Sequence, residues 1–286
     1  MSDALAHCER LVREADKDRF LATLFAPASR RPALYALYAF DIETARVPTA
    51  VRQALAGEIR LQWWREVLEG QRIEEARANP VAAALIQTLD MYGFARAPLI
   101  DLVEARTFDL YSDPFTTVAE FEVYAERTHA SVMICAATLL SGADTNLQKV
   151  ARHAAMASVV CGLLRSFPLR VSRGQVQVPL DVLERHSVQP ENVLAGRSSE
   201  GLLAALSEMR ALARDHFRAF QKLTLTIPAA AVPAFLPVAL VPLYFGRMEG
   251  KDYDPFRTII AVPQWRRQWA LWRAARAWAR HGKPTD

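Results

Sequence analysis

The chain has 286 residues and 51% of them are hydrophobic, so a sizeable core in one large domain is available. The net charge of +4 is modest, and no nucleic-acid-binding module accompanies it, which argues against a nucleic-acid partner. An anionic membrane surface or a phosphorylated ligand suits the same charge. Cys8, Cys135 and Cys161 form no CxxC pair, so we expect no disulfide framework, no zinc site and a reducing, cytoplasmic compartment.

Helical periodicity recurs along the chain and no long strand-like alternation interrupts it. The N-terminal segment has early acidic residues and no apolar core, so we read it as an amphipathic helix and not as a signal or transit peptide. Thr117 and Glu120 form a capping box. A turn is expected at 112–115 and a loop at 141–144. The expected helices are 2–24, 30–46, 49–70, 79–93, 98–110, 117–140, 147–164, 198–223 and 264–280. The pattern predicts an all-α chain of roughly ten to twelve helices.

Residues 227–245 are apolar enough to raise the question of a membrane span. Four prolines, at 228, 233, 237 and 242, interrupt this stretch and would strain a spanning helix. We therefore expect a kinked helix in the core of the protein.

Two groups of tryptophans are candidates for contact with a partner or a membrane. Trp63 and Trp64 are adjacent, so only one can face the core, and we assign the contact to Trp64. Trp265, Trp269 and Trp272 share one stripe of the last helix, flanked by arginines. Packing of that stripe on the bundle is the favoured interpretation, and an interfacial membrane helix is the alternative.

Glu126 and His129 have the Glu-x-x-His spacing of di-iron helix bundles, with Glu122 one turn earlier. Such a site needs a second Glu-x-x-His, and the sequence has none. A solvated or ion-paired helix face is the favoured interpretation.

The stretch 162–179 ends a long apolar helix with three arginines, Arg165, Arg170 and Arg173. Arginines at a helix end complement its negative pole. Buried arginines instead need partners or a cavity. The two interpretations stay open at this point.

Three segments together resemble the squalene/phytoene synthase family: residues 31–40, residues 57–65, and 163–165 with 173–174 and 178–179. The resemblance runs along nearly the whole chain. It implies the all-α isoprenoid synthase fold, a single domain over 1–286 with a bundle around a central cavity. Family members condense two prenyl diphosphates head-to-head, using Mg²⁺ held by two facing aspartate-rich motifs.

Both aspartate motifs are altered in this chain. Ala45 and Arg46 stand where the first aspartate pair is expected. Ser166 and Arg170 stand at the second pair. Gln175 and Gln177 replace a further Arg and Tyr, and only Asp18-Arg19-Phe20 matches an early diphosphate-binding element. Asp41, Glu43, Glu58 and Glu66 are the nearby acids, but their spacing does not favour a relocated metal site. We expect no metal, no cofactor and no catalytic residue.

Residues 57–65 and 162–168 look more like the branch of this family whose mitochondrial members act in respiratory complex I assembly. The chain is similar to a bacterial relative of that branch. We interpret it as a protein without prenyltransferase activity that binds a lipid or isoprenoid, or assists assembly through a respiratory-complex subunit. Its location is expected to be cytoplasmic, with peripheral contact at the inner face of the membrane as the alternative.

Four arginines, Arg46, Arg165, Arg170 and Arg173, are the candidates for binding an anion in the cavity. One alternative is an active, Mg²⁺-dependent prenyl transferase making squalene or phytoene with displaced ligands. Another is a membrane-surface scaffold without a ligand.

Overall fold

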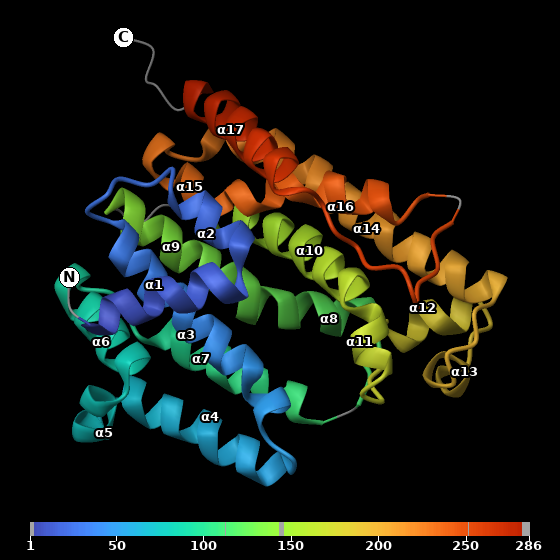
Figure 1. Cartoon of the computed structure of the whole chain (residues 1–286), viewed down its shortest axis with the longest axis horizontal. Helices are drawn as coiled ribbons and strands as arrows, with labels where there is room; N and C mark the ends of the chain where they lie inside the picture. Colours follow the sequence, from blue (N-terminus) through green and yellow to red (C-terminus); the bar gives the residue numbers. More distant parts are fainter. Residues whose placement is uncertain (1–2, 112, 143–145, 251, 282–286) are drawn as a thin grey trace.

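A computed structural model describes residues 3–111, 113–142, 146–250 and 252–281. These residues form helices and connecting loops with no strand, as the sequence predicts (Figure 1). Ser2 of the expected first helix, Ser112 of the expected turn, and residues 143–144 of the expected loop lie outside the described residues.

The first half of the chain forms a layer around helix α3, whose residues Tyr35, Tyr38 and Phe40 are buried. α1 packs on α3 and α6, and α4 packs on α7. The elements are α1 (Asp3–Ala15), α2 (Lys17–Thr23), α3 (Arg31–Ala50), α4 (Ala54–Leu68), α5 (Ile73–Ala78), α6 (Pro80–Tyr92), α7 (Ala97–Arg106) and the 3₁₀ helix η1 (Thr107–Leu110).

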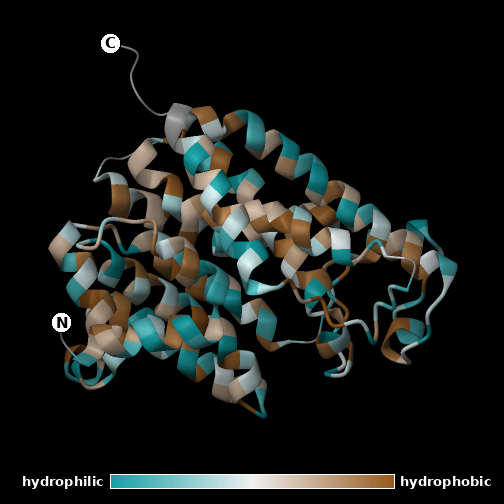
Figure 2. Ribbon diagram, turned by 45° about the horizontal axis from the view of Figure 1, so that its top comes forward, coloured by the Kyte–Doolittle hydropathy of each residue, from teal (hydrophilic) through white to brown (hydrophobic). Residues whose placement is uncertain are grey.

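The second half is built on the pair α10 and α14, which pack along each other. In Figure 1, α10 runs through the middle of the molecule, α17 lies on one side of it, and α4 and α5 lie on the opposite side. The elements are α8 (Val118–Ala125), η2 (Glu126–Ala130), α9 (Ser131–Ser141), α10 (Gln148–Arg165), α11 (Phe167–Val171), α12 (Leu180–Arg185), α13 (Pro190–Leu194), α14 (Glu200–Leu223), η3 (Thr224–Thr226), η4 (Ala229–Ala231), α15 (Val232–Phe235), η5 (Leu236–Leu240), α16 (Val241–Arg247) and α17 (Gln264–His281). Hydrophobic and hydrophilic residues alternate along the helices, as expected where each helix buries one face (Figure 2).

Side-chain caps explain several helix boundaries. The capping box is confirmed: Thr117 Oγ1 accepts a hydrogen bond from the Glu120 amide at 3.2 Å, and Glu120 Oε2 accepts one from the Thr116 amide. The single helix expected over 2–24 is wrong, because the chain breaks at Asp16. The Asp16 carboxylate accepts a hydrogen bond from the Arg19 amide at 2.9 Å and so begins a second helix, α2.

The proline-rich apolar stretch is a continuous but irregular helical run that lies mostly in the core, as the predicted kinked helix requires. It consists of the short turns η4, α15, η5 and α16, because each proline removes a backbone donor. Ala229–Arg247 is long and apolar enough to cross a membrane by length and composition, and 61% of its best window is buried inside the bundle. Its apolar side chains, such as Phe235 and Leu240, therefore pack against protein.

Gly201 in the first turn of α14 tests how closely the chain packs there. A Cβ at this position would lie 2.5 Å from the carbonyl oxygen of His186, which is backbone and cannot rotate away. We expect Gly201→Ala to lower the free energy of unfolding by about 1–3 kcal/mol despite the better helix propensity of alanine. The measurement is urea denaturation.

Gly246→Ala in α16 is the matched control. A Cβ there meets nothing within 4 Å, so this change should stabilise the protein by about 0.5–1 kcal/mol. If Gly201→Ala stabilises the protein as much as Gly246→Ala does, the backbone at Gly201 does not pack as closely against the His186 carbonyl as the structure indicates.

Candidate functional site

A cavity of about 670 Å³ opens where α3, α7, α8, η2 and α11 meet. The four altered motif positions all line it, two from α3 and two from the end of α10 and from α11. Six arginines and three aspartates line the same space. The motif positions are Ala45, Arg46, Ser166 and Arg170; the remaining charged residues are Asp16, Arg19, Asp41, Arg52, Arg106, Asp109 and Arg173. We call this cavity the arginine mouth.

Asp41 is the acidic centre of the mouth, and its carboxylate is already bound by two arginine side chains of the protein. Its carboxylate accepts hydrogen bonds from Arg19 at 2.7 Å and from Arg106 at 3.0 Å. The Asp41 and Arg106 side chains are 3% and 7% exposed, so the pair is shielded from water. Burial by itself would raise the pKa of Asp41, but the two guanidinium groups hold this pKa well below its usual range.

Arg106 extends this centre towards α8. Its Nη1 donates to the hydroxyl of Tyr124 at 2.7 Å, and that hydroxyl donates to Asp109 Oδ2 at 2.7 Å. Burial and the neighbouring charge of Asp109 raise the pKa of Tyr124, since Arg106 offsets them only in part. The hydroxyl therefore stays protonated and keeps Asp109 engaged.

His129 lines the mouth from η2, a π-helical turn inside the long α8–α9 segment. Such turns are rare and often mark functional positions. Burial, together with the positive charge of Arg106, lowers the pKa of His129 to about 3. The imidazole is thus neutral at pH 7. The Glu-x-x-His motif makes no di-iron site, because Glu126 points to Arg152 at 3.5 Å while His129 faces the mouth.

Arg170, Arg46 and Arg173 are unpaired cations of the mouth, and Arg52 is another. Arg170 Nε donates to Ser166 Oγ at 2.8 Å, so two altered motif positions bind each other. Burial lowers the pKa of Arg170, and the nearby Arg106 and Arg173 add to this effect. Within the described part of the chain, none of these arginines forms an ion pair with a carboxylate. Their charges are available to an incoming anion.

Arg165 does not belong to this group. It lies in an adjoining cavity of about 180 Å³, where its guanidinium covers the Tyr244 ring at 3.7 Å. Its charge faces Asp18 at 3.6 Å, and Asp18 also accepts hydrogen bonds from Arg267 and from Tyr244. Arg165 therefore lines the adjoining cavity and not the arginine mouth, and Asp18 offsets its charge only in part because Arg267 shares the same carboxylate.

The Mg²⁺ sites of the family do not fit these residues. Magnesium needs several free carboxylate oxygens at near-octahedral positions. Asp16, Asp41 and Asp109 are bound to Arg19, Arg106 or Tyr124. Across the described ranges, no group of three or more His, Cys, Asp or Glu side chains is arranged to hold a metal ion.

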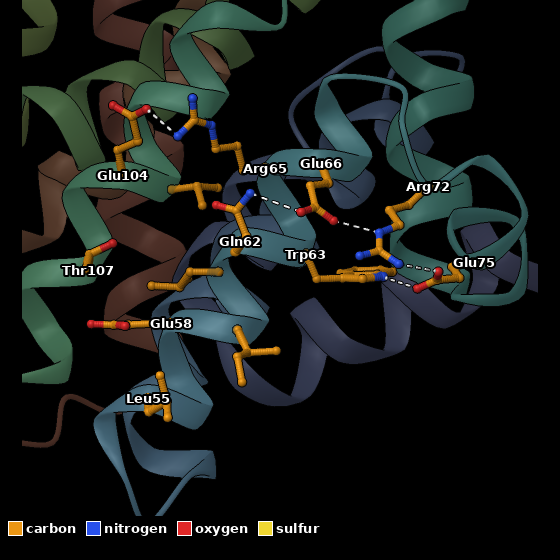
Figure 3. A pocket seen from close by; sticks show the side chains of 13 residues that line it. Leu55, Glu58, Gln62, Trp63, Arg65, Glu66, Arg72, Glu75, Glu104 and Thr107 are labelled. Carbon is orange, nitrogen blue, oxygen red and sulfur yellow. Dashed lines mark hydrogen bonds and ion pairs between the residues drawn. The ribbon is translucent and has the colours of Figure 1, made fainter.

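Glu58 and Glu66, considered above as relocated ligands, lie in a separate groove of about 880 Å³ between α4 and α7 (Figure 3). Its carboxylates are all engaged by neighbouring side chains. Glu66 binds Gln62 and Arg72, Glu75 binds Trp63 and Arg72, Glu104 faces Arg65 and Arg127, and Glu58 binds Tyr111. The groove has no free acidic cluster for a metal.

The tryptophan assignments change in the structure. Trp64 is 4% exposed and packs edge-on against Phe40 at 5.1 Å, so its prediction as a contact residue is wrong. Trp63 is the partly exposed member of the pair and donates to Glu75 at 2.8 Å. Trp265, Trp269 and Trp272 are exposed, so the favoured expectation that they pack on the bundle is also wrong.

Sequence reasoning missed Arg106, Asp109 and Tyr124. Arg106 had a weak signal, as the one cation following the apolar run of α7, but its partner Asp41 is 65 residues away. Arg19 belongs to the segment Asp18-Arg19-Phe20, which resembles a diphosphate-binding element, and that resemblance did not predict its hydrogen bond to Asp41.

The fold and the mouth define an isoprenoid-synthase-type helical protein, and the family comparison agrees. The squalene/phytoene synthase family model matches residues 12–273, so the chain belongs to that family. A dehydrosqualene synthase crystallised with a ligand superposes with a TM-score of 0.83 at 18% identity, covering 96% of both chains. A squalene synthase from Alicyclobacillus acidocaldarius gives a TM-score of 0.71 at 19% identity, covering 86% of this chain and 92% of that one.

Within the family, the similar curated proteins include assembly factors. NADH dehydrogenase (ubiquinone) complex I, assembly factor 6, of Rattus norvegicus is 27% identical over 254 residues, which are 89% of this chain and 76% of that protein. The Homo sapiens protein of the same name is 26% identical, covering 87% and 75%. A 15-cis-phytoene synthase of Synechococcus elongatus is 22% identical, covering 95% and 92%.

Asp41→Asn tests the buried charge centre. Removing the carboxylate charge leaves Arg19 and Arg106 buried without their shared partner, so we expect a loss of about 3–5 kcal/mol in the free energy of unfolding. Because the folded pKa of Asp41 lies below its unfolded value of about 3.9, its stabilisation is present above that pH and is lost as pH falls through the folded pKa. The measurement is denaturant unfolding at neutral and acidic pH.

Asp101→Asn on the exposed face of α7 is the control, and it should change the unfolding free energy by less than about 0.5 kcal/mol. Equal effects of the two substitutions would contradict the central role of Asp41.

Proposed function

We propose that this protein acts by binding, as a respiratory complex I assembly-type factor that holds an anionic isoprenoid or lipid in the arginine mouth without prenyl transfer. The observation that carries the proposal is the placement of Ala45, Arg46, Ser166 and Arg170 around one mouth in which no carboxylate is free. The names of the similar assembly factors support the assembly role.

The chemistry of the mouth favours an anion over a cation. A phosphate or diphosphate group accepts several charge-assisted hydrogen bonds from guanidinium groups, without a metal. Arg170 gains most, because burial and neighbouring cations penalise its charge until an anion arrives. Neutral His129 adds a hydrogen-bonding group without adding charge.

The space behind the mouth supports binding over condensation. The adjoining cavity, lined by Tyr38, Met133 and Val241 among others, has a volume of about 180 Å³. Pockets that enclose small molecules usually exceed roughly 300 Å³. That small volume favours a charged head group held in the mouth over two prenyl chains lying side by side behind it.

The partner we propose is a subunit of a respiratory complex, and the compartment we propose is the cytoplasm.

The three cysteines bear on the compartment. Cys8, Cys135 and Cys161 support a reducing compartment, since all three are buried and unpaired. Burial raises the pKa of Cys8 and Cys135 to about 12, which leaves these thiols protonated and unreactive.

Anion binding should be independent of magnesium. Inorganic diphosphate is the probe, and binding is measured by calorimetry with and without a chelator. We expect the same affinity in both, and a loss of about tenfold or more for each of Arg46→Gln, Arg170→Gln and Arg173→Gln, because a hydrogen bond to a charged group contributes about 1.5–3 kcal/mol. Arg218→Gln, on an exposed face of α14, is the control and should bind normally.

The active-enzyme alternative makes the opposite prediction. Incubation with farnesyl or geranylgeranyl diphosphate and Mg²⁺ should give no C30 or C40 hydrocarbon. Formation of such a product, or diphosphate binding that requires Mg²⁺, would contradict the proposal.

The assembly role is tested in the source cell. Deleting the protein should lower NADH-driven quinone reduction in isolated membranes while succinate-driven reduction is unchanged, because only complex I assembly depends on it. Wild-type protein supplied in trans should restore the activity, and the Arg170→Gln protein should restore less of it. Normal NADH-driven activity in the deletion strain would count against an assembly role.

A further inference from the structure

Helix α17 has two apolar stripes, and the bundle uses only one. Leu271 and Ala274 are buried, and Trp278 packs edge-on against Phe220 with ring centres 5.3 Å apart. The second stripe faces away from these residues. Trp265, Trp269 and Trp272 are 64%, 55% and 40% exposed. Because a helix turns by about 100° per residue, these three rings fall within a sector of roughly 60°.

The exposed rings are arranged as a platform with arginines. Trp269 and Trp272 stack with ring centres 5.0 Å apart. Arg276 lies over the Trp272 ring at 4.6 Å, and Arg266 lies over the Trp265 ring at 5.2 Å. Ordered aromatic and guanidinium groups lose little conformational freedom when a surface covers them.

The charge of this region has one sign. The sequence from 255 to 281 contains six arginines and no Asp or Glu. Arg267 turns inward and binds Asp18 at 2.8 Å, while Arg266, Arg273 and Arg276 are exposed. An outward face with three tryptophans and three arginines, and no carboxylate of its own helix, complements a negatively charged apolar surface.

An apolar groove of about 600 Å³ adjoins this face. It lies between α17, α14 and α16, and Phe217, Leu243 and Ala274 line it. The candidate spanning stretch Ala229–Arg247 contributes only part of this lining, and 61% of its best window is buried in the bundle. Most of the hydrophobic stretch thus packs against the bundle, whereas the tryptophan face of α17 is exposed.

We propose that α17 docks the protein on an anionic phospholipid surface, with Trp265, Trp269 and Trp272 at headgroup depth and Arg266, Arg273 and Arg276 on lipid phosphates. Tryptophan is suited to the membrane–water interface, and basic residues near an anionic leaflet strengthen binding. The helix lies on the bilayer and does not cross it. This docking does not depend on a ligand in the arginine mouth or on complex I.

Flotation with lipid vesicles tests the docking with the full chain. Vesicles of phosphatidylcholine with phosphatidylglycerol should carry the protein, and vesicles of phosphatidylcholine alone should not. Arg266→Gln/Arg273→Gln/Arg276→Gln should weaken binding by about 100-fold, from roughly fivefold for each basic residue near an anionic surface. Trp265→Ser/Trp269→Ser/Trp272→Ser should weaken it by about tenfold or more, since apolar burial at the interface is lost.

Matched triple variants on other surfaces are the controls. Arg77→Gln/Arg197→Gln/Arg218→Gln removes three exposed arginines elsewhere, and Leu55→Ser/Ile59→Ser/Ile73→Ser removes three exposed apolar side chains of the α4–α5 region. Both controls should bind like the wild type. Equal weakening in a control and its α17 counterpart, or no binding of the wild type to anionic vesicles, would overturn the proposal. Diphosphate binding should be unchanged in the α17 variants, which separates this test from that of the mouth.

Discussion

The buried carboxylate of Asp41 holds the centre of this protein together. It is shared by Arg19 of α2 and Arg106 of α7, and Arg106 passes the network on to Tyr124 of α8. Four helices thus meet at one negative charge. An isolated buried ion is costly, so each of these side chains is stable in its place only because the others are present.

This charge centre also decides what the cavity can do. In a metal-dependent synthase the carboxylates at the mouth must be free to bind Mg²⁺. Here Asp16, Asp41 and Asp109 are bound to protein donors, while Arg46, Arg170 and Arg173 have no carboxylate partner in the described structure. The balance of free charge at the mouth has changed sign. A site of this kind is complementary to a phosphate group itself, and not to the cation that would bridge to it.

The outer surface of the bundle carries a second feature, the tryptophan face of α17, which is built separately from the mouth. Asp18 ties α2 to α10, α16 and α17 by binding Arg165, Tyr244 and Arg267. By fixing the inner side of α17, this contact leaves the tryptophan face directed to solvent. The mouth and the α17 face are built by different residues, so a ligand and a membrane need not compete for the same surface.

The sequence by itself determined the helical class, the capping box at Thr117 and the family, because periodicity, caps and local motifs are short-range properties. It also identified Ala45, Arg46, Ser166 and Arg170 as the altered motif positions. Only the tertiary structure decided which charges are free. Asp41 pairs with partners 22 and 65 residues away, and Arg165 shares Asp18, a residue far from it in the chain, with Arg267. The same holds for the tryptophans: periodicity shows that Trp265, Trp269 and Trp272 share a face, and that only one of Trp63 and Trp64 faces inward. Which face is buried depends on the neighbouring helices, and their positions are set by packing over the whole chain.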